Sequence, residues 1–288
     1  MIIIPGSTSN SIASDIAKTL KKRLIKPVIK RFPDNELYIQ IPEPIADEDI
    51  VIVQNTYPDQ NIIELLLLQD AAYEAKAQTI TVIIPYYGYG RQDKKFQEGE
   101  PISARALAEH ISIHADNIIT IDPHKEHILR FFNIPSEICT PLHEIADYLK
   151  MNITIDIVLA PDKGAYDRAK KISKLINADV DVLDKKRIDG YTVQMTPKNL
   201  DVKDKRVVIV DDIISTGGTM TQAIKELKRQ GAKEISVVCT HGLFIEDAEI
   251  RIKNAGCDNI ISTDTIETKY SKVKTAPSLI PSLKKLIK

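Results

Sequence analysis

The stretch VVIVDDIISTGGTM, from Val207 to Met220, combines a strand with a loop able to hold an anion. Four aliphatic residues precede the adjacent carboxylates of Asp211 and Asp212, as in a strand that leaves a buried parallel sheet. Ligands of open parallel sheets lie at the carboxyl ends of the strands, so we expect the two acids at such an end. They could accept hydrogen bonds from sugar hydroxyls or hold a hydrated Mg²⁺.

The loop that follows the acids consists of Ser215, Thr216, Gly217, Gly218 and Thr219. Its glycines let the backbone wrap closely around a ligand because they lack Cβ. Its amides and hydroxyls, with the following helix N-terminus, suit a phosphate. No lysine follows the glycines, so this is not a Walker loop. The pattern predicts a sugar-phosphate site; the alternatives are a tight strand–helix turn capped by Ser and Thr, or the acidic pair of a phospho-acceptor domain.

The composition limits the classes of function. The chain has 288 residues, 39 basic and 40 acidic, so its formal charge of −1 predicts no general surface for nucleic acid or anionic membranes. Its three cysteines form no CxxC pair, which favours a reducing compartment over a disulfide framework. The start MIIIPGSTSN lacks a basic region, and no apolar stretch approaches the roughly 20 residues of a bilayer span. We therefore expect a cytoplasmic protein.

Apolar runs of strand length alternate with segments of helical period along the chain. For example, KRVVIVDD (205–212) leads into a helical segment at 219–232 and then into KEISVVCT (233–240). The strands are rich in Ile and Val on both faces, as buried parallel strands are. This alternation predicts an α/β fold with mainly parallel sheets flanked by helices.

The two halves of the chain resemble each other. A strand ends at Gln54 and the next begins near Ile80, 26 residues later; another ends at Asp211 and the next begins near Ile235, 24 residues later. We interpret this as a tandem duplication, the alternative being the general likeness of any two βαβ units. The first copy has Gln54 and Asn55 in place of the acids and lacks the glycine-rich loop, so only the second is expected to keep the sugar-phosphate site.

A length of 288 residues suits about two domains of roughly 100–200 residues each. The helical segment CTPLHEIADYLKMN lies between the two copies, so the expected domains are 1–145 and 146–288. The last segment, PSLIPSLKKLIK, is predicted to form a terminal helix.

Two segments of the first half carry residues suited to a nucleotide. RFPDNELYIQ (31–40) places an aromatic ring that could stack on a base, and acceptors that could read an amine, before an alternating strand; a turn with a buried Phe is the alternative. YYGYGRQDKK (86–95) gathers cations that could grip a polyphosphate, or that could form a solvated basic loop. The residues concerned are Phe32, Asp34, Asn35, Glu36, Arg91, Gln92, Lys94 and Lys95.

Four further candidates follow strand-like runs. His124 in DPHKEH and Asp162 in LAPDKGA each come just past such a run, where a capping or core role is the alternative to metal binding. Mg²⁺ prefers oxygen, so chemistry alone favours the aspartate as its ligand. Lys185 and Arg187 come at a strand end before a glycine-containing turn. They could neutralise a phosphoryl group in transfer, or form an exposed basic hairpin tip.

A close resemblance links VDDIISTGGT to the phosphoribosyl-binding signature of the type I phosphoribosyltransferase fold. The whole chain resembles the ribose-phosphate pyrophosphokinase family through RFPDNE, YYGYGRQDKK, DPH, APDKGA, DKKR and VDDIISTGGT, in this order. The short length and the compact segment DKKRIDGYTV are similar to archaeal members. The resemblance implies two tandem phosphoribosyltransferase-like domains. It also implies transfer of the diphosphoryl group of ATP to the 1-hydroxyl of ribose 5-phosphate, with Mg²⁺, in nucleotide biosynthesis.

The resemblance further implies a role for each matching residue. The ATP-binding residues would be Phe32, Asp34, Asn35, Glu36, Arg91 and Gln92. The residues that bind ribose 5-phosphate would be Arg187, Asp211, Asp212, Ser215, Thr216, Gly217, Gly218 and Thr219. Lys185 and Arg187 would be catalytic, and His124 and Asp162 would be the magnesium-site positions. A homo-oligomer with its ATP site near a subunit interface is expected.

Two segments depart from the family's pattern. Lys163, Gly164 and Ala165 follow Asp162 where many members have a small residue and two glycines, which leaves the role of Lys163 open. The residues on either side of His124 also differ from the commoner leucine and small or polar residues. The frame DxH favours His124 over His127 as the ligand and leaves the role of His127 open.

Two other functions share parts of this pattern. A phosphoribosyltransferase would consume the activated sugar, but the ATP-type loops of the first half disfavour it. A non-catalytic regulatory homologue would bind nucleotide and associate with the active enzyme. The presence of Lys185, Arg187 and the intact 211–219 segment disfavours that alternative.

Overall fold

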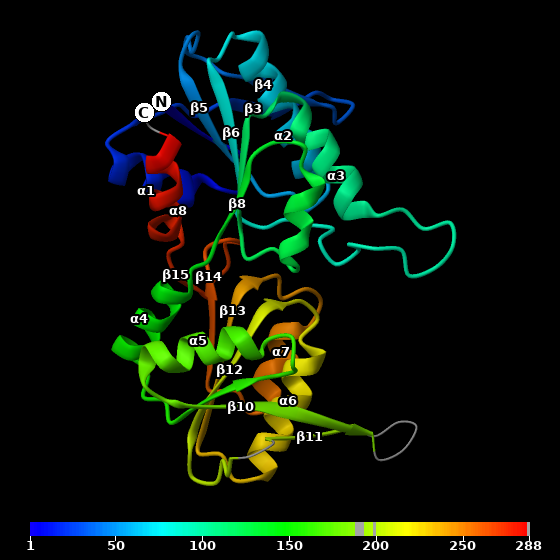
Figure 1. Cartoon of the computed structure of the whole chain (residues 1–288), viewed down its shortest axis with the longest axis vertical. Helices are drawn as coiled ribbons and strands as arrows, with labels where there is room; N and C mark the ends of the chain where they lie inside the picture. Colours follow the sequence, from blue (N-terminus) through cyan, green and yellow to red (C-terminus); the bar gives the residue numbers. More distant parts are fainter. Residues whose placement is uncertain (188–192, 198–199, 287–288) are drawn as a thin grey trace. The chain divides into compact units, whose positions relative to one another are not determined.

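The computed structural model describes residues 1–187, 193–197 and 200–286, with the backbone alone at 184–187, 193–196 and 286. Contacts divide the chain into two compact units, one formed by residues 1–140 with 275–288 and the other by residues 141–274. Each unit is a mainly parallel sheet flanked by helices (Figure 1). The predicted α/β class, with two domains of one architecture, is therefore confirmed.

The first unit contains a six-stranded sheet in the order β2-β1-β5-β6-β7-β8, in which every pair is parallel. Its strands are β1 (Ile2–Pro5), β2 (Arg23–Leu24), β5 (Asp49–Val53), β6 (Thr79–Ile84), β7 (Asn117–Ile121) and β8 (Ser136–Cys139). A separate antiparallel hairpin joins β3 (Val28–Arg31) to β4 (Leu37–Gln40). The helices are α1 (Asn10–Leu20), α2 (Gln60–Glu74), α3 (Ser103–Ile111), α8 (Ala276–Leu286) and the 3₁₀ helices η1 (Ser112–His114) and η2 (Glu126–Phe131).

Successive residues of a strand point to opposite sides of the sheet. Because consecutive residues here are apolar, both faces of the sheet are apolar. Val51 belongs to the core cluster of Ile16 on α1 and Leu283 on α8. Its neighbour Ile52 belongs to the cluster of Leu65 on α2. The helices α1 and α8 accordingly lie side by side on one face, and α2 and α3 cover the other (Figure 1).

The second unit contains a seven-stranded sheet in the order β11-β10-β9-β12-β13-β14-β15, parallel except for the pair β10–β11. Its strands are β9 (Ile157–Ala160), β10 (Asp179–Arg187), β11 (Val193–Pro197), β12 (Arg206–Ile214), β13 (Glu234–Gly242), β14 (Asn259–Thr263) and β15 (Ser271–Val273). Its helices are α4 (Leu142–Asn152), α5 (Tyr166–Ile176), α6 (Gly218–Arg229) and α7 (Ala248–Asn254).

The second core repeats this arrangement. Val208 of β12 shares a cluster with Leu149 of α4 and Ile172 of α5. The next residue, Ile209, shares the opposite cluster with Ile224 of α6 and Ile252 of α7. The central strand β12 is therefore covered on both faces, as the Ile- and Val-rich runs of the sequence predict.

The two units differ from the expected domains 1–145 and 146–288 at both boundaries. Helix α4 belongs entirely to the second unit because Leu142 and Ile145 lie in its core. Helix α8 belongs to the first unit because Leu279 and Leu283 join the core around α1. The end of the chain thus returns to the first unit after the second is complete.

Helix α2 also carries apolar side chains on its outer side. Leu65 and Leu68 are fully buried, whereas Ile63 is 54% exposed and Leu67 is 37% exposed. With 15 residues, α2 is still shorter than a bilayer-spanning helix. None of the described helices combines the length and apolar character needed to cross a membrane.

Candidate active site

The acid pair lies within strand β12 rather than after it. The strand continues to Ile214, and Asp211 pairs in register with Cys239 of β13. Both acids are half-buried. The N–H of Asp212 donates to Asp211 Oδ1 at 2.9 Å, and the N–H of Ile213 donates to Asp212 Oδ1 at 2.8 Å. These bonds fix both carboxylates close to the carboxyl end of a central strand, where ligands of parallel sheets bind.

Burial raises the pKa of the Asp211 carboxyl to about 8, and the nearby charges of Asp212 and, more weakly, Asp162 act in the same direction. Burial and like charge therefore favour the protonated form of Asp211 more than in an exposed aspartate. The charge interaction with Asp162 also shows that the loop after β9 lies close enough to β12 to act on the same site.

The loop between β12 and α6, with the first residues of α6, is suited to bind an anion. We call residues 215–219 the anion cup. Gly217 has φ of +73°, a conformation that favours glycine, and a Cβ on it would lie close to Ile252 Cδ1, at 3.1 Å. A Cβ on Gly218 would meet nothing within 4 Å, so that side of the loop is open. In the part of the chain that is described, no side chain caps the N-terminus of α6. Its first N–H groups are thus available to an anion.

The predicted hydroxyls surround this cup, and one further residue holds it. Ser215 and Thr219 are half-buried, and Thr216 is exposed. Arg251 of α7 donates through Nη2 to the carbonyl of Thr216 at 2.8 Å. The sequence did not point to Arg251, because it lies 35 residues from its partner and in no recognisable motif.

Asp162 organises the turn that immediately precedes α5. Its Oδ1 accepts hydrogen bonds from the N–H groups of Gly164 at 2.8 Å and Ala165 at 3.2 Å. These amides belong to the loop and not to the helix, so the capping role considered from the sequence is not observed. Both bonds use Oδ1, so Oδ2 is available to a ligand, and the adjacent Lys163 is exposed.

The two predicted magnesium-site positions lie in different units. His124 is half-buried between β7 and η2 of the first unit, and Asp162 follows β9 in the second. Among the residues that the structure describes, no three His, Cys, Asp or Glu side chains form a group that could hold a metal ion. The assignment of His124 and Asp162 to Mg²⁺ stays a prediction.

The predicted catalytic pair lies at the end of β10. Lys185 pairs in register with Met195, and Arg187, the last residue of the strand, pairs with Val193. The side chains of Lys185 and Arg187 lie outside the described part of the structure, as do residues 188–192. Their catalytic roles stay predictions.

The turn between β3 and β4 carries four predicted ATP-binding residues, all exposed. Phe32 is 47% exposed and meets Tyr38 edge-on, with ring centroids 5.8 Å apart, so the alternative of a buried Phe is wrong. The N–H of Phe32 donates to the carbonyl of Glu36 at 2.9 Å, and Asp34 Oδ1 accepts from the N–H of Glu36 at 3.1 Å. Asn35 adopts φ of +74°. The turn thus presents a ring and two carboxylates to solvent.

The loop after β6 carries the other predicted ATP-binding residues. Arg91, Lys94 and Lys95 are exposed. Gln92 instead accepts a hydrogen bond from Ser103 Oγ at 2.6 Å and so attaches the loop to the start of α3. Exposure suits a polyphosphate grip and a solvated basic loop alike, so these ATP-binding roles also stay predictions.

The end of β5 supports this loop in a way that the sequence did not reveal. Asn55 Oδ1 accepts from the N–H of Tyr86 at 2.7 Å, and Thr56 Oγ1 accepts from the N–H of Gly88 at 2.7 Å. A Cβ on Gly88 would lie 2.7 Å from the Thr56 carbonyl oxygen, so this close approach requires glycine. The segment that replaces the acid pair in the first unit therefore positions the basic loop.

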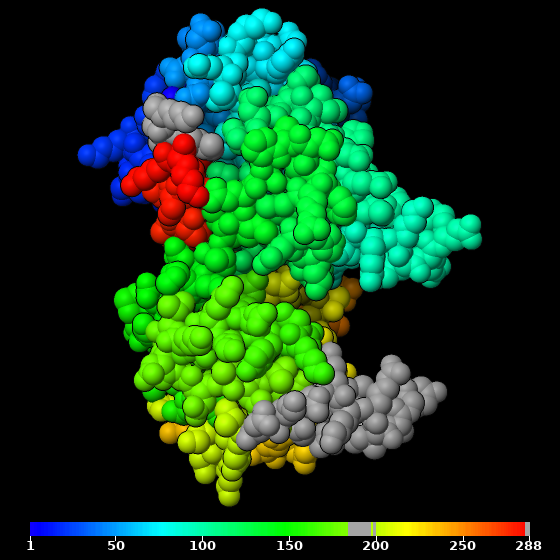
Figure 2. Space-filling view, in the orientation of Figure 1, coloured from blue at the N-terminus to red at the C-terminus, as the bar shows by residue number. Residues whose placement is uncertain are grey.

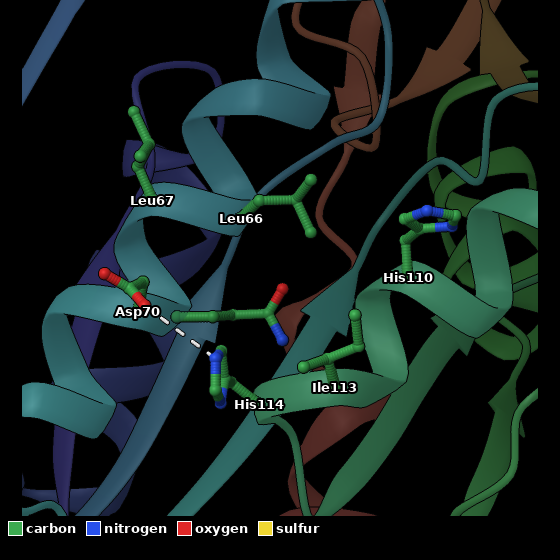
Figure 3. A pocket seen from close by; sticks show the side chains of 7 residues that line it. Leu66, Leu67, Asp70, His110, Ile113 and His114 are labelled. Carbon is green, nitrogen blue, oxygen red and sulfur yellow. Dashed lines mark ion pairs between the residues drawn. The ribbon is translucent and has the colours of Figure 1, made fainter.

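A hollow between α2 and α3 is lined by none of the predicted site residues (Figure 3). Its volume is about 280 Å³, and its lining residues are Leu66, Leu67, Gln69, Asp70, His110, Ile113 and His114. His114 Nε2 lies 3.7 Å from Asp70 Oδ1 and forms an ion pair when protonated. An apolar wall without a basic cluster does not suit a phosphate, so this hollow is not a candidate substrate site.

Comparisons with known proteins show which family the chain belongs to. Residues 1–114 match the N-terminal domain of ribose phosphate pyrophosphokinase, and residues 138–272 match the phosphoribosyl transferase domain. A ribose-phosphate pyrophosphokinase of Methanopyrus kandleri is 36% identical over 290 residues, which cover 99% of each chain. That of Sulfurisphaera tokodaii is 39% identical over 293 residues, which cover 100% of each chain.

The crystal structure of phosphoribosylpyrophosphate synthetase from Mycobacterium smegmatis has a similar fold. Its TM-score is 0.86 at 27% identity, and the match covers 99% of this chain and 98% of that chain. Both units and nearly the full length are thus shared with these proteins, and the two relatives named above are archaeal. The chain belongs to the ribose-phosphate pyrophosphokinase family.

Proposed function

We propose that the chain transfers the diphosphoryl group of ATP to the 1-hydroxyl of ribose 5-phosphate, giving 5-phosphoribosyl 1-diphosphate and AMP. The observation that carries this function is the open anion cup of α6 beside the acid pair of β12, in a chain that matches the family along its whole length. The product would supply nucleotide biosynthesis.

The ribose 5-phosphate site is proposed at residues 211–219. The amides of the loop and of the α6 N-terminus would bind the 5-phosphate, because they offer N–H donors at the positive end of a helix dipole. Asp211 and Asp212 would accept hydrogen bonds from ribose hydroxyls. With the 5-phosphate bound by the loop and the hydroxyls bound by the acids, the 1-hydroxyl of the ribose would be oriented for attack on the nucleotide.

The ATP site is proposed at the exposed elements of the first unit. Phe32 would stack on the adenine, and the acceptors Asp34, Asn35 and Glu36 would contact the nucleoside. Arg91 would bind phosphate oxygens through its planar guanidinium. Gln92, whose side chain is bonded to Ser103, would act chiefly by anchoring the loop.

The oxygen donors of Asp162, Asp211 and Asp212 fit Mg²⁺, which prefers carboxylates and phosphate oxygens. Burial and the mutual repulsion of these acids raise the pKa of Asp211, as expected where a cation normally completes the site. The imidazole of His124 fits less well on donor chemistry, and its place rests on the family resemblance. When bound, Mg²⁺ would neutralise charge on the phosphate oxygens.

The reaction forms a bond between O1 of the ribose and the β-phosphorus of ATP. It breaks the bond from that phosphorus to the oxygen bridging to the α-phosphorus, which leaves with AMP, and the 1-hydroxyl loses its proton. Positioning and charge neutralisation carry most of the catalysis in phosphoryl transfer. Lys185 and Arg187 would stabilise the charge on the transferred group and on AMP.

We also propose a homo-oligomer in which the ATP hairpin lies near a subunit interface. Ile63 and Leu67 of α2 are exposed beside the hairpin. A hollow of about 450 Å³ there is lined by Arg31, Asn35, Glu36, Leu37, Gln60, Ile63 and Leu67. Exposed apolar side chains that form a patch often mark protein contacts. Light scattering of the purified protein tests this proposal, and a monomer at working concentrations would count against it.

The deciding experiment is AMP release from ATP and Mg²⁺ with and without ribose 5-phosphate, followed by phosphorus NMR of the product. We expect sugar-dependent AMP and a new diphosphate on the anomeric carbon. Binding of ATP and ribose 5-phosphate without AMP release would instead indicate the non-catalytic regulatory homologue.

A further inference from the structure

The loop after β6 ends in an exposed tip. Figure 2 shows this segment protruding from the first unit. The N–H groups of Phe96 and Gln97 both donate to Glu100 Oε2, at 2.7 and 3.0 Å. In the described structure, the hydrogen bonds of residues 94–100 stay within the tip. Its position therefore depends on how its two ends are attached.

One attachment is a contact between a histidine and a carboxylate immediately before the tip, which becomes an ion pair when the histidine is protonated. His127 Nε2 lies 3.1 Å from Asp93 Oδ2, and the Asp93 side chain is only 10% exposed. A nearly buried carboxylate needs a hydrogen-bond partner. Gln92, the preceding residue, is already bonded to Ser103. The contact with His127 thus extends the anchored part of the loop by one residue, up to the start of the exposed lysines.

His127 lies on a segment that packs against the core of the first unit. It lies in η2, where its ring meets Phe131 edge-on with centroids 6.0 Å apart. The next residue, Ile128, is fully buried in the core. A Cβ on Gly90 would lie 3.3 Å from Ile128 Cδ1 and 3.7 Å from His124 Cβ, so the loop and the segment that carries His124 are packed directly together.

We propose that His127 is a positioning residue for the nucleotide: by binding Asp93, it holds Arg91 and the following lysines in place against the segment that carries His124. This inference rests on the proposed function, because the polyphosphate of ATP is the ligand that the loop would bind. It assigns a role to a residue whose surroundings depart from the family's pattern.

The kinetic test compares His127→Ala with His127→Gln. The amide of Gln keeps an N–H donor for Asp93, so it should retain activity close to that of the wild type. Loss of the polar contact with the Asp93 carboxylate should raise the KM for ATP about tenfold in the Ala variant. The kcat and the KM for ribose 5-phosphate should change less than about twofold. The matched control is His143→Ala, an exposed histidine on α4.

A second readout needs no activity. Trypsin cleaves after exposed lysines, so cleavage after Lys94 and Lys95 in the unliganded protein reports how firmly the tip is held. We expect cleavage several times faster in His127→Ala and Asp93→Ala, no further increase in the double variant, and the wild-type rate in His127→Gln.

Equal behaviour of the Ala and Gln variants would overturn the proposal, as would additive effects in the double variant. A fall in kcat at unchanged KM for ATP would also overturn it. If the wild type forms no AMP, the proposed function fails, and the proteolysis experiment still decides whether His127 holds the loop.

Discussion

Six strands follow the same order in both sheets, but two corresponding strands differ in the side chains at their carboxyl ends. The order β2-β1-β5-β6-β7-β8 corresponds strand by strand to β10-β9-β12-β13-β14-β15, as a tandem duplication predicts. The end of β5 is followed by Gln54 and Asn55, which are buried amides. The corresponding β12 carries Asp211 and Asp212, which are half-buried acids.

In the first unit, side chains of the protein itself close this end of the sheet. The carboxylate of Glu64 on α2 accepts hydrogen bonds from the N–H and Oγ of Ser7 at 2.6 and 2.7 Å. Gln54 Nε2 also donates to Glu64 at 2.7 Å, and Thr8 Oγ1 donates to Gln54 at 2.8 Å. An internal anion therefore takes the donors that an external anion could have used.

In the second unit, the corresponding end is left open. Space beside Gly218 is free, and burial with like charges raises the pKa of Asp211 to about 8. The comparison shows that one framework can serve either purpose. Where side chains of the protein satisfy the donors, the end of the sheet supports other loops. Where they do not, as we propose for the second unit, a ligand would supply the missing partners.

The largest effect that distinguishes the units is expected at Lys185 and Arg187, the pair proposed to be catalytic in the second unit. Lys185→Ala should lower kcat by about a thousandfold, because a cation that stabilises the transferred phosphoryl group contributes about that much to the rate. The KM for ribose 5-phosphate should change by less than about threefold. Steady-state AMP release at varied ribose 5-phosphate measures both. Equal losses in kcat and sugar affinity would argue against a transition-state role.

The substitution Gly218→Asp would place a carboxylate at the anion cup of the second unit. The new carboxylate would act as Glu64 does in the first unit and repel the 5-phosphate, which should raise the KM for ribose 5-phosphate at least about tenfold. The melting temperature should be unchanged or higher, because a Cβ there meets nothing within 4 Å and an acid suits a helix N-terminus. The uncharged control is Gly218→Asn; an equal rise in KM with Asn would indicate steric blockage.

The substitution Glu64→Gln would disrupt the hydrogen bonds that close the corresponding end of the first sheet. The side chain of Glu64 is buried and accepts from three donors, so an amide group in its place leaves at least one of them without an acceptor. We expect a loss of about 1–3 kcal/mol in the free energy of unfolding, measured with urea. The KM for ribose 5-phosphate should not change. The exposed Glu74 of the same helix provides the control Glu74→Gln, and a similar loss there would contradict the assignment.

The smallest effect is expected in the pH dependence of the stability of the protein, to which Asp211 contributes. Its pKa of about 8 lies above the ordinary value of about 3.9, so the native state binds more protons than the unfolded state between these pH values. The contribution of this carboxyl is therefore lost as the pH rises toward 8. Asp211→Asn, which loses no proton, should melt a few degrees higher than the wild type at pH 8, with a smaller difference at pH 5. A pH-independent difference in unliganded thermal scans would show that the carboxyl is ionised throughout.

Local sequence patterns predicted most of the fold. The helical segment expected at 219–232 is α6, which runs from Gly218 to Arg229. The apolar run before Asp211 is the buried part of β12, although the strand continues to Ile214 because its last residues still pair with β13. Short-range periodicity and apolar runs determine such elements, so no distant contact is needed to find them.

The sequence by itself determined the elements, the repetition of one framework, and the stretch with the acid pair and the glycine loop, because each depends on residues that are neighbours in the chain. The tertiary structure decided that Glu64 closes the first framework, that Arg251 holds the Thr216 carbonyl, and that His127 binds Asp93. It also decided that α8 packs on the first unit. These contacts join residues that are distant in sequence, and packing rather than local preference selects which buried polar groups meet.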